Sequence, residues 1–213
     1  MPLHARSPIL LFLFLALGPR PAEGQADYVK LSEAREVALA RSAAPVAVSG
    51  DATIWVLREG TYEIAVQGSN GNACMVSRTW PTSLEPICYD GEGARTLLPI
   101  ETRFVEARID LGDRGAARAK VDAAIESGHL PLPDRPSMTY MLSSGQRLVA
   151  DDGRDVGRWR PHFMMYIPYL RSEDVGIFGS TSQIFVAREG EPLAHLITVA
   201  PEWVDPAEDN SSR

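Results

Sequence analysis

The chain has 213 residues, two cysteines and a formal net charge of −7. An acidic chain repels the phosphates of nucleic acids and anionic lipid headgroups, and no run of Lys or Arg offsets this, so neither is an expected partner. The length allows one sizeable hydrophobic core and predicts a single domain.

The N-terminus has the pattern of a secretory signal peptide. Residues 9–17 (ILLFLFLAL) form an apolar run after a short leader with His4 and Arg6, and small residues precede a predicted cleavage site after Gly24. The alternative is a short anchor helix that stays attached, but nine residues fall well below the roughly 20 needed to span a bilayer. We expect a mature chain without a membrane span, either periplasmic or secreted.

Cleavage would leave a domain over residues 25–205 and a polar, acidic, disordered tail over 206–213. Removing residues 1–24 takes away two arginines and one glutamate, so 21 basic and 28 acidic residues become 19 and 27, a net charge of −8. The mature chain is therefore also acidic.

Cys74 and Cys88 are the two cysteines of the chain. Export would place them where disulfides persist, so we predict a bridge between them. The alternatives are a reactive thiol, which usually stands alone, and a two-cysteine metal site, which is usually more tightly spaced.

The N-terminal part of the domain is predicted to be a short helix followed by strands. Residues 33–43 (EAREVALARSA) form a helix capped by Ser32. Strands at 52–57 and 62–67 flank a turn, and Asn70-Gly71 is a strong hairpin signal before a third strand at 73–80. These signals predict a three-stranded antiparallel meander, followed by a proline-containing loop at 81–87 that the disulfide would fasten to the third strand.

A helical block follows at 92–127, where apolar residues recur at three- and four-residue spacing. Pro99 predicts either a kink or a helix that begins near it. A second helix is predicted over the run RGAARAKVDAAIESG (114–128), in which the last residue, Gly128, takes the C′ position just after the helix.

The C-terminal part is predicted to be strands at 138–144, 146–150, 162–167, 183–187 and 195–200, with hairpin turns at 151–153 and 188–194. Strands come first and last, with helices between them and no regular alternation. We therefore expect an α+β fold, with a mainly antiparallel sheet built from N- and C-terminal hairpins and the central helical block packed on it.

His162 is the candidate catalytic residue, because it begins an apolar strand directly after Pro161. Strand alternation places His162, Met164 and Tyr166 on one face, and Arg160 lies just before them, so Arg160, Met164 and Tyr166 are the candidate ligand-binding residues. His195 lies in a strand and could face either way.

Three interpretations of His162 stay open. It can be a core histidine that bonds a backbone carbonyl. It can be the general base of a small hydrolase, with Ser143 or Ser144 as nucleophile and Asp151 or Asp155 as orienting group, although no hydrolase motif is present.

The third interpretation is a Cu(I) ligand, together with Met164 and with Met138 or Met141. Because methionine is also an ordinary core residue, we predict no metal and no cofactor. The expected function is a module of the cell envelope or exterior that binds a small molecule or has a structural role.

Several stretches together resemble an uncharacterised family of exported bacterial proteins. They are SNGNACMVSRTWP (69–81), PICYDGEGARTLLP (86–99), HLPLPDRPSMTYMLSSGQ (129–146), WRPHFMMYIPY (159–169) and EPLAHLITVAPEWVDP (191–206). The resemblance covers roughly residues 33–206; family members carry an aromatic residue where this chain has Asn72. It implies a bacterial, exported, single-domain protein, and it transfers no activity, cofactor or functional residue.

Overall fold

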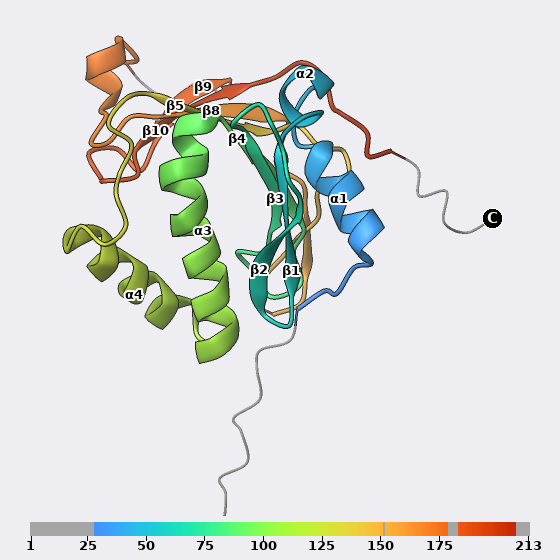
Figure 1. Ribbon diagram of the computed structural model, residues 1–213. Coiled ribbons are helices and arrows are strands. Elements are labelled where there is room, and N and C mark those ends of the chain that lie inside the picture. Colours follow the sequence, from blue (N-terminus) through green and yellow to red (C-terminus); the bar gives the residue numbers. More distant parts are fainter. Residues whose placement is uncertain (1–27, 151, 179–182, 208–213) are drawn as a thin grey trace, which may run out of the picture.

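The computed structural model describes residues 28–150, 152–178 and 183–207 (Figure 1). The predicted signal peptide, and the tail beyond residue 207, lie outside the described residues. The described helices are α1 (Glu33–Arg41), α2 (Val46–Ser49), α3 (Gly91–Leu111), α4 (Arg114–Glu126) and the 3-10 turn η1 (Ser172–Val175). The described strands are β1 (Thr53–Arg58), β2 (Thr61–Val66), β3 (Ala73–Ser77), β4 (Glu85–Tyr89), β5 (Ser137–Met141), β6 (Leu148–Val149), β7 (Asp155–Gly157), β8 (His162–Tyr166), β9 (Ile184–Ala187) and β10 (His195–Val199).

The fold is α+β, as predicted. Eight strands form one sheet in the order β2-β1-β3-β4-β5-β8-β10-β9, and β6 pairs with β7 in a separate ribbon. All neighbouring pairs of the large sheet are antiparallel except β1 and β3, which are parallel. The predicted hairpins β1–β2 and β9–β10 are both present.

The predicted N-terminal meander is wrong, because β3 pairs with β1 and not with β2. The Asn70-Gly71 segment does not close a hairpin; the connection from β2 to β3 passes the first residues of β1. Its polar groups bond the chain before β1: Asn70 Nδ2 and Asn72 Nδ2 donate to the Val48 carbonyl at 2.9 and 3.2 Å, and Ser69 N donates to the Asp51 carbonyl at 2.8 Å. These non-local bonds outweigh the local turn signal.

The sheet curves around α3, while α1 and α2 cover the opposite face of β1, β3 and β4 (Figure 1). A large apolar cluster lies between the sheet and α3, with Met75, Phe104 and Val105 almost fully buried. A smaller cluster lies under α1 and includes Leu39 and Ile54. The sheet therefore has a core on both faces.

The sequence of α3 explains where the helix begins and ends and which face it turns to the sheet. Asp90 caps it by accepting from Gly93 N at 2.7 Å, and Gly112 ends it in the left-handed conformation. The helix runs through Pro99, so it does not begin there. Of the apolar residues that recur at three- and four-residue spacing, Leu97 and Phe104 face the core, whereas Leu111 at the end of the helix is exposed.

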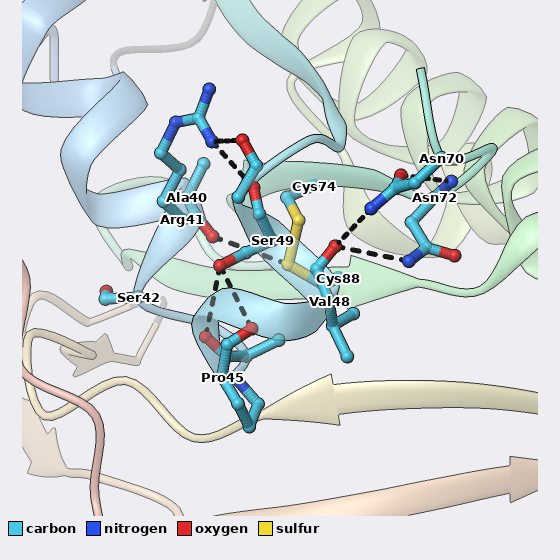
Figure 2. Close-up of a disulfide and its surroundings, with 12 residues drawn as sticks. Ala40, Arg41, Ser42, Pro45, Val48, Ser49, Asn70, Asn72, Cys74 and Cys88 are labelled. Carbon is cyan, nitrogen blue, oxygen red and sulfur yellow. Dashed lines mark hydrogen bonds between the residues drawn. A yellow bond between two sulfur atoms is a disulfide. The ribbon is translucent and has the colours of Figure 1, made fainter. Parts of the chain in front are cut away.

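The disulfide between Cys74 and Cys88 is present (Figure 2). The two residues lie directly opposite each other on β3 and β4, in the fully buried cluster under α1. The prediction that Cys88 follows a loop is wrong, because β4 begins at Glu85 and includes Pro86. A proline is tolerated there since the ladder between β4 and β5 pairs only Cys88 and Tyr89.

A buried ion pair joins the N-terminal segment to the sheet. Arg78, directly after β3, is fully buried, and its Nη1 lies 2.9 Å from Oε1 of Glu36 on α1. Arg78 Nε donates to the Val29 carbonyl at 3.2 Å, and the same Glu36 oxygen accepts from Leu57 N at 3.1 Å. One buried pair thus connects α1, β1, β3 and the segment before α1.

Candidate functional site

A pocket of about 530 Å³ lies between the concave face of the sheet and α3. Residues two apart on a strand share a face, so β4, β8 and β10 each present alternate side chains to it, and β5 presents Met141. Its walls include Glu85, Ile87, Leu97, Glu101, Met141, Trp159, Arg160, His162, Met164, Tyr166, Phe185, His195 and Ile197. Ligand sites typically combine such an apolar wall with a few polar groups, which makes this pocket the candidate site.

The four predicted site residues come together here: Arg160, His162, Met164 and Tyr166 all line the pocket. The ladders from β8 to β5 and β10 place His162, Met164 and Tyr166 on one face, as strand alternation predicts. The Arg160 carbonyl lies 2.6 Å from His162 Nδ1. The carbonyl can only accept, so Nδ1 carries the proton and Nε2 is an acceptor. His162 is buried, which lowers the pKa of its imidazole.

A second histidine, whose orientation the sequence left open, also lines the pocket. His195 stacks on Tyr166, with ring centroids 4.5 Å apart, and its Nδ1 lies 2.9 Å from the Leu193 carbonyl. It has the same tautomer as His162 for the same reason. Burial lowers the pKa of His195 as well.

Two carboxyl groups of the pocket were missed by the sequence analysis. Glu85 lies on β4 and is only 5% exposed, and the half-buried Glu101 lies on α3. The sequence does contain a signal for each of them. Glu85 lies two residues from the apolar Ile87, on the same face of the strand, and Glu101 lies four residues after Leu97, at a helix position where an apolar residue is expected. A carboxylate at a core position points to a specific environment or a function.

The surroundings of Glu85 explain why this side chain is tolerated. Its Oε1 accepts from Thr79 N, Thr79 Oγ1 and Ser83 Oγ at 3.0, 2.6 and 2.6 Å. Burial nevertheless raises the pKa of Glu85 to about 7, because these bonds only partly offset the loss of water. Burial also raises the pKa of Glu101, against the opposing effects of a hydrogen bond from Ser77 Oγ and of two nearby arginines on α4.

The residues that a hydrolase would need lie elsewhere. Ser143 Oγ bonds Ser42 Oγ at 2.6 Å, and Ser144 Oγ donates to Asp205. Asp155 accepts from Gly157 N and pairs with an arginine, and Asp151 lies outside the described residues. None of the described three lines the pocket with His162.

The proposed copper ligands are only partly brought together. Met141 is the direct ladder partner of His162 and lines the pocket with Met164, whereas Met138 pairs with Met165 on the other face of the sheet. Among the described residues, no group of three or more His, Cys, Asp or Glu side chains could hold a metal ion.

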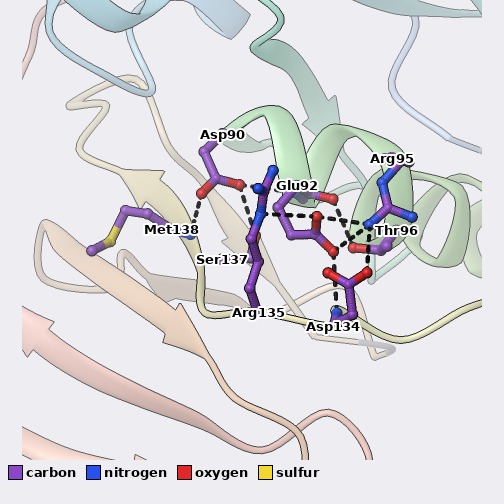
Figure 3. Close-up of polar contacts among 9 residues, drawn as sticks. Asp90, Glu92, Arg95, Thr96, Asp134, Arg135, Ser137 and Met138 are labelled. Atoms are coloured by element: carbon purple, nitrogen blue, oxygen red, sulfur yellow. Dashed lines mark hydrogen bonds and ion pairs between the residues drawn. The ribbon is translucent and has the colours of Figure 1, made fainter.

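Helix α3, which forms one wall of the pocket, is held by a polar cluster at its N-terminus (Figure 3). The capping Asp90 also accepts from Ser137 Oγ and Met138 N at 2.8 and 2.9 Å, which ties the helix to β5. The buried Glu92 pairs with Arg95 at 2.7 Å and Arg135 at 3.3 Å. These bonds hold the first turns of α3 over β4 and β5, and so fix the position of the helix that forms one wall of the pocket.

A second cleft of about 650 Å³ lies between α3, α4 and the β1–β2 turn. Its charged side chains include Arg103, Asp110 and Lys120, which are exposed and of mixed sign. Its wall is less apolar than that of the first pocket.

The chain matches no protein-family model, no curated protein and no solved structure. The resemblance to exported bacterial proteins therefore stays a prediction. The disulfide indicates an oxidising compartment. Within the described part of the chain, no helix has the length and apolarity needed to cross a membrane.

Proposed function

We propose that this chain is an exported binding module that holds a small, largely apolar molecule in the pocket between the sheet and α3. The pocket itself carries the proposal: about 530 Å³ of space walled by Met, Ile, Leu, Phe and Trp side chains, with a few polar groups among them. The signal-peptide pattern and the disulfide support export to the periplasm or the exterior.

The positions of the polar groups favour binding over hydrolysis. A serine hydrolase needs a hydroxyl within reach of the histidine, and Ser143 and Ser144 are bonded to groups outside the pocket. His162 instead accepts through Nε2, which suits a role in holding a ligand.

The test is binding of N-phenyl-1-naphthylamine, an uncharged dye whose fluorescence rises in apolar surroundings, by the oxidised mature chain. Ile197→Trp places an indole in the pocket from the centre of β10 and should abolish the signal. Thr198→Trp is the matched control, because this exposed neighbour points to the other face of the same strand. Absence of dye binding by the wild type, or equal binding by both variants, would contradict the proposal.

A further inference from the structure

Both carboxyl groups of the pocket have Ser77 as a neighbour. Ser77 on β3 is the direct ladder partner of Glu85 on β4, and its Oγ donates to Glu101 on α3. All three residues line the pocket. Two acids from different elements are thereby brought to one wall.

Each of these acids has an oxygen with no donor. All three hydrogen bonds to Glu85 reach Oε1, and no described residue donates to its Oε2. The bond from Ser77 reaches Oε1 of Glu101, and Oε2 again receives none from the described residues. Both side chains line the pocket, so these oxygens are open to a donor that a ligand supplies.

Neither carboxyl group is in a direct ion pair. Within the described part of the chain, no basic side chain lies within 4 Å of either carboxyl group. The arginines nearest to Glu101 lie over aromatic rings: the guanidinium carbon of Arg118 is 4.3 Å from the centre of the Phe104 ring, and that of Arg114 is 4.8 Å from the centre of the Trp80 ring. Two acids thus face an apolar space without an ion pair.

Two further polar groups of the pocket wall are acceptors. His162 and His195 both use Nδ1–H on a backbone carbonyl, so each offers the lone pair of Nε2. The Tyr166 hydroxyl donates to Met164 Sδ at 3.8 Å. Arg160 also lines the pocket, but it already has a partner. The two carboxyl groups and the two imidazoles therefore suit a ligand that donates hydrogen bonds.

We propose that the ligand is an apolar amine in its protonated form, with its ammonium group held by Glu85 and Glu101 and its apolar body packed along Met141, Met164 and Ile197. This inference rests on the proposed function, since it names the class of molecule that the pocket takes. An ammonium group has three donors and a positive charge, so it supplies both things that the two carboxyl groups lack. A carboxylate would bring another negative charge up to the two acids, and an alcohol would supply one donor and no charge.

The test compares three ligands that share one apolar body: 1-naphthylmethylamine, 1-naphthalenemethanol and 1-naphthaleneacetate. Each displaces N-phenyl-1-naphthylamine from the oxidised mature chain at pH 7.5. We expect the amine to bind roughly tenfold to a hundredfold more tightly than the alcohol, as is typical of a hydrogen bond to a charged group, and the acid to bind most weakly. In Glu85→Gln, and separately in Glu101→Gln, the advantage of the amine over the alcohol should fall to a few-fold while affinity for the alcohol is kept.

Glu63→Gln is the control, because this exposed glutamate lies on β2 at the far edge of the sheet. If the dye binds but the amine has no advantage over the alcohol, or the acid binds best, the amine inference is overturned and the binding function stands. If the amine advantage survives both Gln substitutions, the carboxyl groups are not its origin and the inference is also overturned. If neither the dye nor any of the three ligands binds, the proposed function fails and the inference falls with it.

Discussion

Replacing Glu85 with Gln should flatten the dependence of stability on pH. The carboxyl group is 5% exposed, and its pKa rises from 4.5 to about 7 in the folded chain. A raised pKa means that the folded state holds the proton more tightly than the unfolded state. Glu85 therefore contributes stability below pH 4.5 that is lost as the pH rises through 7.

The size of the effect follows from the two pKa values. The full shift corresponds to about 3.4 kcal/mol, and about 2–3 kcal/mol of it is lost between pH 5 and pH 8. Gln keeps an oxygen that can accept from Thr79 and Ser83 but has no proton to lose. Glu85→Gln should therefore lose about 2–3 kcal/mol less free energy of unfolding than the wild type between these two pH values.

The assay is urea unfolding of the oxidised mature chain at pH 5 and pH 8, followed by circular dichroism. The comparison cancels the other titrating groups, because they are common to both proteins. Glu63→Gln serves as the control, since an exposed carboxylate contributes little. The reasoning is refuted if Glu85→Gln and the wild type lose the same stability from pH 5 to pH 8.

Three further outcomes are expected. Replacing both cysteines with alanine should lower the free energy of unfolding by about 3 kcal/mol, in urea titrations without reductant, because the bridge closes a loop of about 15 residues; no loss would show that the bridge is not formed. Glu36→Gln should cost about 3–5 kcal/mol, because it leaves the Arg78 charge buried without its partner. Glu33→Gln, at an exposed pair, should cost less than about 1 kcal/mol, and equal costs would refute the contrast. For His162, burial lowers the pKa, so its contribution is present above pH 6.5 and is lost as the pH falls through the folded value; His162→Phe should make the decline of thermal stability below pH 6.5 shallower, and an unchanged decline would contradict this.

Much of the fold could be predicted because its signals are local. Ser32 caps α1 by accepting from Arg35 N, and the apolar spacing of α3 and α4 identifies both helices. The parallel partner of β3 could not be predicted, because the bonds from the Asn70–Asn72 segment to Val48 join residues more than 20 positions apart. Local turn propensity carries no information about such contacts.

Only the part of the candidate site that lies on a single strand could be predicted from the sequence. Strand alternation brings His162, Met164 and Tyr166 together, since it depends on one strand alone. Glu85 and Glu101 come from a strand and a helix that meet only in the folded chain. Each is visible in the sequence as an acid at a core position, but their meeting in one pocket depends on how α3 lies over β4.

The strand order has a consequence for how the chain folds as its strands become available in order. From β4 onward each added strand extends one edge of the sheet, first β5, then β8, and finally β10 with β9 outside it. Until residues 137–141 are available to pair with it, β4 is an uncovered edge that can pair with another chain. The half of the pocket on β8 and β10 is assembled last, so the pocket is complete only in the full sheet. Shortened or stalled products would lack this half of the pocket and keep an open edge prone to self-association.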